Sequence, residues 1–392
     1  MSEWEEVTFG DVFEISSAKR VTKSQWKNEG VPFYRAREVV KLAREGSVAN
    51  ELFISEEMFQ EYSEKYGVPE DGDLMVSGVG TLGACYVVRP SDRFYYKDAS
   101  VLRFHPKREI CADYFKHAFR TRLVLDQVES GSGSTVGTYT ISRAQRTRVP
   151  LPPLSEQKRI AEILDRAEAL RAKRRAALAL LDELTQSIFL EMFGDPVSNP
   201  KSLPRKRLGA IGRIVTGNTP PRKREDFYGE FIEWIKSDNL NCPNYYATVA
   251  SEHLSVEGAK VGRIAPKESI LITCIAGSPD CIGNAAMVDR NVAFNQQINA
   301  IVDPEANPHF LYAQTIVGKR LIQQVSSNGM KGIVSKGRLE GVEYLVPPQH
   351  DQDVFASRAM QIEEMKSRLL CSSFALAQLF ASLQHRAFRG EL

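Results

Sequence analysis

The sequence predicts an α+β fold in which one mixed α/β globular unit and one long helix occur twice in succession. The first observation is a glycine-free segment after Pro152-Pro153 that is dense in strong helix formers. The second is a similar segment after Pro347-Pro348. The third is the return of the glycines and apolar runs of residues 1–150, in the same order, roughly 200 residues later. Two similar globular units separated by two long helices, related by a pseudo-two-fold repeat, are therefore expected.

The first globular unit alternates short β-like runs with turn residues, a pattern typical of antiparallel strands. The expected strands cover residues 7–15, 31–37, 73–77, 84–88 and 100–104, and a helix at 112–128 and a Ser/Gly-rich loop at 130–139 follow them. The glycines from Gly78 to Gly83 lack the Gly-x-x-x-x-Gly-Lys-Ser/Thr pattern and precede a strand. We interpret them as a tight turn and not as a phosphate-binding loop.

The helix after Pro153 is predicted to begin at Ser155, which can cap its amino end, and to end at Gly194 before Pro196. Apolar residues recur in it at alternating intervals of three and four, which is the spacing of a coiled-coil seam. The predicted seam consists of Ile160, Ile163, Ala167, Leu170, Ala177, Leu181, Leu184 and Ile188, with Arg174 as a polar member. A stripe this narrow requires a partner helix.

The second half of the chain supplies that partner. Residues 196–346 repeat the order of the first unit, because Gly209 stands at the place of Gly10 and Gly283 at the place of Gly83. In the helix that follows, the matching seam consists of Ile362, Met365, Leu369, Leu376, Leu379 and Leu383, with Ser372 as a polar member.

The two helices are expected to run antiparallel, with Leu170 and Leu379 shielded from solvent. The predicted boundaries are residues 1–150 for the first globular domain, 151–195 for the first helical region, 196–346 for the second globular domain and 347–392 for the second helical region.

Composition is ordinary for a globular chain of 392 residues, with 43% hydrophobic and 26% charged residues and a formal net charge of +2. The charge is uneven, because residues 143–175 hold ten Lys/Arg against four Asp/Glu, which suits a polyanionic partner. No apolar run approaches a membrane span, and the amino end is acidic where a signal peptide is basic. A cytoplasmic location and no membrane contact are expected.

Catalytic and metal sites are not indicated. Asn199-Pro200-Lys201 is not the Asn/Asp-Pro-Pro-Tyr/Phe motif of DNA amino-methyltransferases, and the acids of residues 69–73 have no nearby lysine. The six histidines are scattered without ligand spacing, and the six cysteines form no Cys-x-x-Cys pair. We expect a chain that performs no chemistry and holds no metal.

If the polyanionic partner is a nucleic acid, contacts to its bases and phosphates are expected from exposed loops with cations, amides and hydroxyls. In the first globular unit the candidate DNA-binding residues are Lys19, Arg20, Lys23, Arg35, Arg37, Ser134, Thr135 and Tyr139. In the second unit they are Thr219, Arg222, Lys223, Arg224, Lys236, Asn239, Asn328 and Lys331.

Three motifs carry a resemblance to a known family. Leu151–Gln157 reads LPPLSEQ, Phe189–Asp195 reads FLEMFGD and Ala387–Leu392 reads AFRGEL. In these motifs and in its repeat the chain resembles the specificity subunit of type I restriction-modification enzymes over essentially its whole length. The second helical region departs from the motif, with Gln349-His350-Asp351-Gln352 in place of Leu-Ser-Glu-Gln.

The resemblance implies two target-recognition domains that bind an asymmetric, bipartite double-stranded DNA target, with the half-site spacing set by the coiled coil. It also implies two modification (methyltransferase) subunits and added restriction (translocase/endonuclease) subunits as partners. S-adenosylmethionine, ATP and Mg would then belong to those partners and not to this chain. The alternative is a coiled-coil scaffold whose globular units bind protein or another ligand, with the basic helix as an assembly surface. Only DNA binding would fall steeply with salt.

Overall fold

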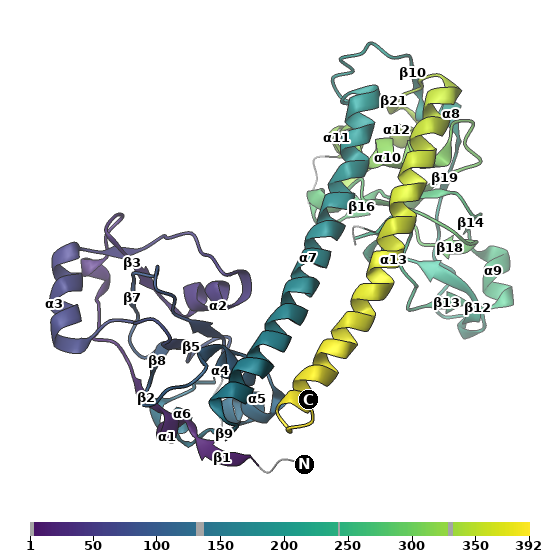
Figure 1. Cartoon of the computed structure of the whole chain (residues 1–392). Helices are drawn as coiled ribbons and strands as arrows, with labels where there is room; N and C mark the ends of the chain where they lie inside the picture. The colour runs from purple at the N-terminus through teal and green to yellow at the C-terminus, as the bar shows by residue number, and fades with distance from the viewer. Residues whose placement is uncertain (1–3, 131–136, 242–243, 328–331) are drawn as a thin grey trace. The chain divides into compact units, whose positions relative to one another are not determined.

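The computed structural model describes residues 4–130, 137–241, 244–327 and 332–392. The chain divides into two compact units, Met1–Lys173 with Ser373–Leu392, and Arg174–Ser372. Each unit holds one globular head together with part of both long helices, α7 (Leu154–Phe193) and α13 (Gln349–Ala387) (Figure 1). Within the described ranges, no helix has the length and apolarity needed to cross a membrane.

The first head is built on a four-stranded antiparallel sheet in the order β2-β8-β5-β6. A second, three-stranded sheet has the order β4-β3-β7. A short pair, β1 with β9, joins the start of the head to its end. The strands are β1 (Glu5–Thr8), β2 (Phe13–Ser16), β3 (Val31–Tyr34), β4 (Phe53–Ile54), β5 (Leu74–Ser77), β6 (Cys85–Val87), β7 (Tyr95–Tyr96), β8 (Val101–Pro106) and β9 (Arg148–Leu151). The helices are α1 (Phe9–Val12), η1 (Lys23–Gln25), α2 (Ala36–Glu45), α3 (Glu56–Tyr66), α4 (Ala112–Ala118), α5 (Arg122–Glu129) and α6 (Ile141–Arg146).

Three expected elements of the first head differ in the structure. The run 31–37 is a strand only as far as Tyr34, because α2 begins at Ala36. The run 7–15 is not one strand, because the α1 turn separates β1 from β2. The helix 112–128 is two helices, because the hydroxyl of Thr121 accepts the backbone N–H of Val124 and starts a new helix there. The mixed α+β class itself is confirmed.

The second head repeats the order of the first. Its central sheet is β11-β19-β15-β17, a second sheet runs β13-β12-β18-β14, and β10 pairs with β21 as β1 pairs with β9. The strands are β10 (Arg205–Arg207), β11 (Arg213–Thr216), β12 (Tyr228–Ile235), β13 (His253–Leu254), β14 (Ile264–Ala265), β15 (Ile270–Thr273), β16 (Ile275–Ala276), β17 (Ala285–Met287), β18 (Val292–Phe294), β19 (Ile298–Val302), β20 (Gly332–Ile333) and β21 (Glu343–Leu345). The helices are α8 (Leu208–Ile211), η2 (Glu225–Phe227), η3 (Ser237–Leu240), α9 (Val256–Val261), η4 (Pro279–Cys281), α10 (Pro308–Val317), α11 (Lys319–Gln324) and α12 (Lys336–Glu340).

One side chain at the start of each long helix shows the duplication at atomic level. Gln157 donates to the carbonyl of Pro152 at 2.9 Å and accepts the backbone N–H of Cys111 at 3.0 Å. Gln352 makes the same two bonds, to Pro347 at 2.8 Å and from Asn307 at 3.0 Å. Cys111 and Asn307 are the N-caps of α4 and α10, so each glutamine fastens a head to its helix in the same way.

The ends of the long helices complete the cores of the heads. In the first unit, the core cluster of the head includes Ile160 and Leu164 of α7, Phe380 of α13 and Phe388 just after the end of α13. In the second unit, the roles reverse, and Phe189 and Phe193 of α7 join the start of α13 in the core of that head. The beginning of one helix therefore packs with the end of the other, which confirms the antiparallel arrangement.

The predicted seam is half correct. Ten of the predicted positions are buried or half-buried: Ile160, Ile163, Ala167, Ala177, Leu181 and Ile188 of α7 and Ile362, Leu369, Leu376 and Leu383 of α13. Leu170, Leu184, Met365 and Leu379 are exposed, between 43% and 53%, so their assignment to the seam is wrong.

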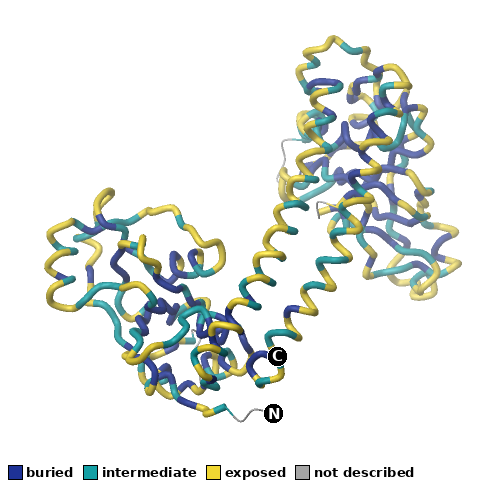
Figure 2. Tube along the Cα trace, in the orientation of Figure 1, coloured by how far each residue is buried: buried dark blue, intermediate teal, exposed yellow. Residues whose placement is uncertain are grey.

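The error is a shift by one residue in every second seam position. Phe380 is buried where Leu379 was expected, and Leu164 is more deeply buried than its neighbour Ile163. The remaining positions fall on polar residues such as Arg171 and Lys366, which an apolar pattern does not favour. Figure 2 shows the result, with exposed and half-buried residues alternating along the middle of both helices.

Leu164→Ala is expected to lower the free energy of unfolding by roughly 2–5 kcal/mol, because the side chain is fully buried in the first core. Leu170→Ala, six residues on and 45% exposed, should cost no more than about 0.5 kcal/mol. Denaturant melts of the two variants provide the measurement. An equal loss of unfolding free energy in both variants would show that Leu170 is buried between the helices, as the sequence predicted.

Candidate nucleic-acid interface

In the first head, three loops form a basic hollow of about 380 Å³. Arg20 and Lys23 come from the segment after β2, Val79 from the glycine turn after β5, and Lys97 from the loop before β8. The guanidinium of Arg20 pairs with Asp98 at 2.9 Å, yet its side chain is 74% exposed. Three cations against one acid leave this hollow positively charged, as contact with phosphate requires.

Lys19 borders the same region. Its backbone N–H donates to the hydroxyl of Tyr95 at 3.0 Å, and its ammonium lies 5.4 Å from the centre of the Tyr66 ring. The loop before β8 also holds Ala99 at a φ of 56°, an uncommon conformation for a residue with a Cβ. The loop is thus held in a defined shape beside the cations.

The candidates at the start of α2 are engaged by acids. Arg35 pairs with Glu38 at 2.7 Å, and Arg37 pairs with Glu38 at 2.6 Å and also with Glu51. Burial acts to raise the pKa of Glu38, but the hydrogen bonds from Arg35 and Arg37 outweigh it and leave the pKa lowered. Arg35 and Arg37 can reach a phosphate only by giving up part of this network.

The second head places its candidates around aromatic rings. Arg222 lies 4.7 Å from the centre of the Tyr228 ring and 4.9 Å from that of Trp234, and Lys236 lies 5.2 Å from Trp234. Glu252 binds both cations, at 2.7 Å in the case of Arg222. Their hydrogen bonds lower the pKa of Glu252. The cluster presents two cations on one rigid support.

The other candidates of the second head divide into paired and structural residues. Arg224 pairs with Asp226 at 2.6 Å, and Thr219 bonds with Gln296. Asn239 caps η3 by accepting the backbone N–H of Lys236 at 3.0 Å, which is the place that Glu38 occupies at α2. Lys223 is exposed.

Four sequence candidates, Ser134, Thr135, Asn328 and Lys331, lie outside the residues that the structure describes. Tyr139 is a core residue, because it is 1% exposed and its hydroxyl bonds with Thr147 at 2.8 Å. Its assignment to the DNA-binding set is therefore corrected: the ring is needed inside the first head and cannot face a ligand.

Sequence reasoning missed the loop before the last strand of each central sheet, β8 in the first head and β19 in the second. Lys97 in the first head and Asn295 in the second each donate a backbone N–H to the end of an equivalent strand, at Tyr34 and Ile235. The next residues, Gln296 and Gln297, bring side-chain amides to the loop of the second head. The repeat offset of roughly 200 residues relates the two loops and could have identified these residues from the sequence.

One group of possible metal ligands lies together in the described part of the chain. Atoms of His117, Asp165 and Glu168 all lie within 4.8 Å of one another. Both acids already face cations, Asp165 with Lys116 at 2.9 Å and Glu168 with Arg120. Burial acts to raise the pKa of Asp165, but hydrogen bonds from His117 and Lys116 lower it to about 2. We interpret the group as an ionic network that fastens α4 to α7.

The fold and these surfaces define a class: an internally duplicated α+β protein with two similar heads, two long antiparallel helices and cation- and amide-bearing loops at equivalent places. The sequence model of the type I restriction modification DNA specificity domain matches residues 1–179 and 200–369. The chain belongs to this family.

Known proteins agree with that assignment. The specificity subunit of the type I restriction enzyme HindI of Haemophilus influenzae is 26% identical over 199 residues, which is 49% of this chain and 42% of that protein. A second curated relative from the same organism is 28% identical over 182 residues, 46% of this chain and 44% of its own length. The chain thus spans under half the length of these two relatives.

Two solved structures share the fold over the full chain. The type I restriction-modification S subunit of M. genitalium superposes with a TM-score of 0.57 at 15% identity, covering 98% of this chain and 96% of that one. A chain from a study of assembly and conformational transition of the type I system gives 0.61 at 16% identity, covering 100% and 99%. The predicted architecture of two heads and two helices is confirmed.

Lys97→Ala is expected to weaken binding to duplex DNA and to reduce the slope of log affinity against log salt by about 1, because one phosphate contact is lost. Lys107→Ala is the matched control, since Lys107 follows the opposite end of β8 and donates to the carbonyl of Gly10 at 2.6 Å. Fluorescence titrations at several salt concentrations provide the slope. An unchanged slope in Lys97→Ala would remove the basic hollow from the interface.

Proposed function

We propose that the chain is the non-catalytic DNA-reading subunit of a type I restriction-modification complex and binds an asymmetric, bipartite duplex target. The observation that carries the proposal is the duplicated head with different polar residues at equivalent places. Where the first head has Lys97, the second has Asn295, and where the first has Glu38, the second has Asn239. Heads of one fold and unlike surfaces suit two different short sequences.

The long helices support a fixed separation between the two half-sites. The 40 residues of α7 correspond to about 60 Å of helix, and one turn of B-DNA advances about 34–36 Å. A helix of set length can then determine which two segments of the duplex are read, while the bases between them remain free.

Deletion of residues 176–179 from α7 is expected to shorten the helix by about 6 Å and the unspecified spacer of the target with it. The readout is the map of methylated adenines in cells that express the chain with its modification subunit. A spacer that keeps its length in the shortened variant would contradict the role of the helix.

Partner docking is the second part of the proposal. In the second unit, α7 and α13 border a groove of about 530 Å³ whose walls include Leu180, Leu184 and Met365. Leu180 is 65% exposed, and exposed apolar side chains gathered in a groove mark interaction surfaces. We assign this surface to a modification subunit. S-adenosylmethionine, ATP and Mg would act on the modification and restriction subunits.

Leu180→Asp is expected to reduce co-purification with the modification subunit at least tenfold, because a charge would be buried in an apolar contact. Leu190→Asp is the control, since Leu190 is also exposed on α7 but lies outside the groove. Melting temperature and DNA affinity should match the wild type in both variants. If Leu180→Asp co-purified with the modification subunit as well as the wild type does, the groove would not be the docking surface.

The scaffold alternative uses the basic helix as an assembly surface and requires heads that bind protein or another ligand. It predicts duplex affinity with almost no dependence on salt. A steep salt dependence of the wild-type chain decides for the DNA-reading function.

A further inference from the structure

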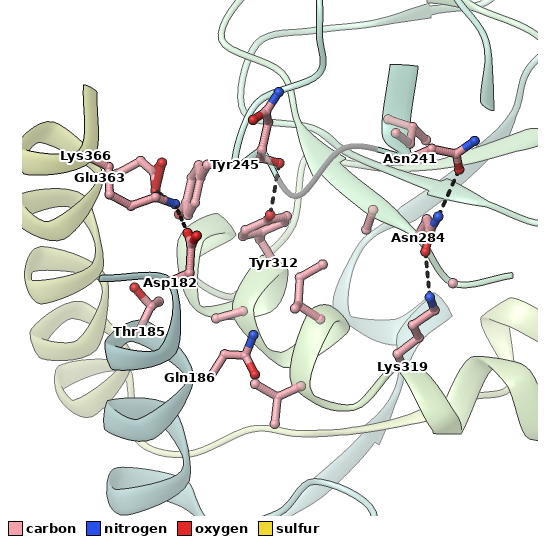
Figure 3. A pocket seen from close by; sticks show the side chains of 17 residues that line it. Asp182, Thr185, Gln186, Asn241, Tyr245, Asn284, Tyr312, Lys319, Glu363 and Lys366 are labelled. Carbon is pink, nitrogen blue, oxygen red and sulfur yellow. Dashed lines mark hydrogen bonds and ion pairs between the residues drawn. The ribbon is translucent and has the colours of Figure 1, made fainter. Parts of the chain in front are cut away.

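A pocket of about 360 Å³ lies within the second unit, where α7 and α13 face the head (Figure 3). The rings of Tyr245 and Tyr312 form part of its wall, and Ile316 and Val317 of α10 add apolar surface. Tyr245 and Tyr312 are only 6% and 9% exposed, so packing holds both rings in place at the pocket wall.

One wall of the pocket carries more negative than positive charge. The ammonium of Lys366 lies 2.7 Å from a carboxylate oxygen of Asp182 and 3.1 Å from one of Glu363. The side chains of Lys366 and Glu363 are only 13% and 21% exposed. Two carboxylates thus share a single ammonium in a partly desolvated place, which leaves room for a second cation.

The duplication shows which position in the first unit corresponds to Glu363. Gln157 and Gln352 are equivalent, because they make the same pair of hydrogen bonds. Glu168 follows Gln157 by eleven residues, and Glu363 follows Gln352 by eleven residues along a continuous helix. Glu168 and Glu363 therefore occupy the same place relative to their heads.

In the first unit, that place is filled by an arginine. Arg120 pairs with Glu168 and donates to the carbonyl of Ala43 at 3.0 Å. It directly precedes Thr121, the N-cap of α5. The residue that directly precedes the N-cap of α11 in the second unit is Val317, and Val317 lines the pocket.

The nearest other cation of the pocket does not replace Arg120. Lys319 donates to the side chain of Asn284 at 2.5 Å and to the carbonyl of Asp280 at 2.6 Å. Figure 3 shows it on the wall opposite Glu363. The second unit therefore keeps the acid of the ion pair and the space for its partner, but has an aliphatic side chain where the first unit has the guanidinium.

We propose that this pocket receives the guanidinium of an arginine side chain from a partner subunit, which pairs with Glu363 and lies against the rings of Tyr245 and Tyr312. A planar guanidinium suits both a carboxylate and an aromatic face. The proposal rests on the proposed docking of a modification subunit and adds one specific contact to it. The first unit, which carries its own arginine, has no need of such a contact.

The test uses the full chain with isotope-labelled Ile and Val methyl groups and N-acetyl-L-arginine amide as the probe. Saturable shifts of the Ile316 and Val317 methyl signals are expected, with an affinity in the millimolar range for a single side chain. Glu363→Gln should weaken the binding at least tenfold. Glu364→Gln is the matched control, because Glu364 is the next residue, is exposed and pairs with Arg368 at 2.5 Å.

Val317→Arg places a guanidinium from the chain itself in the pocket, where it can pair with Glu363. This variant should no longer show the Ile316 shifts that N-acetyl-L-arginine amide induces, and its melting temperature should rise. If that variant does not fold, Glu363→Gln alone decides. No saturable shift in the wild type, equal binding by Glu363→Gln, or equal binding of N-acetyl-L-lysine amide would each overturn the proposal. Salt-dependent DNA binding, measured on the same sample, tests the proposed function separately.

Discussion

Completion of each head by both long helices is the constraint on which the rest of the structure depends. The core of the first unit takes Ile160 from near the start of α7 and Phe388 from just after the end of α13. The core of the second takes Phe193 from the end of α7 and Phe355 from the start of α13. A head without either helix would expose buried aromatic rings, so the heads and helices must fold as one system.

The cations of the heads follow a common rule: most are already paired. Arg35, Arg222 and Arg224 each bind a neighbouring carboxylate, and several lie over aromatic rings. Such pairing fixes the position of a cation before a ligand binds. It also reduces the free energy gained on binding, because a phosphate must compete with the carboxylate for the cation. The basic hollow with Lys23 and Lys97 differs, since its cations outnumber its acids.

The sequence predicted the duplication and the antiparallel helices well, because these depend on periodic features that repeat. It failed where polar residues such as Arg171 and Lys366 take half-buried places on the helices, and where two adjacent residues were both apolar. Ile163 and Leu164 fit a seam equally, and only the shape of the head decides that Leu164 is the buried one. For the candidate site, the sequence indicated which loops carry cations but not which acids pair with them. Glu252, for example, pairs with Lys236 although it lies sixteen residues away in the chain. Tyr139 shows a further limit, because a tyrosine in a polar loop gives no sign of a buried role.

The stacked rings at the junction of head and helix recur in both units. Tyr114 of α4 stacks on Phe388 at 4.9 Å, and Phe310 of α10 stacks on Phe189 at 5.7 Å. Together with the backbone N–H that each glutamine accepts, they give the two heads the same attachment to the helices. Loops far from this attachment can differ in sequence without disturbing it, as they do between the two heads.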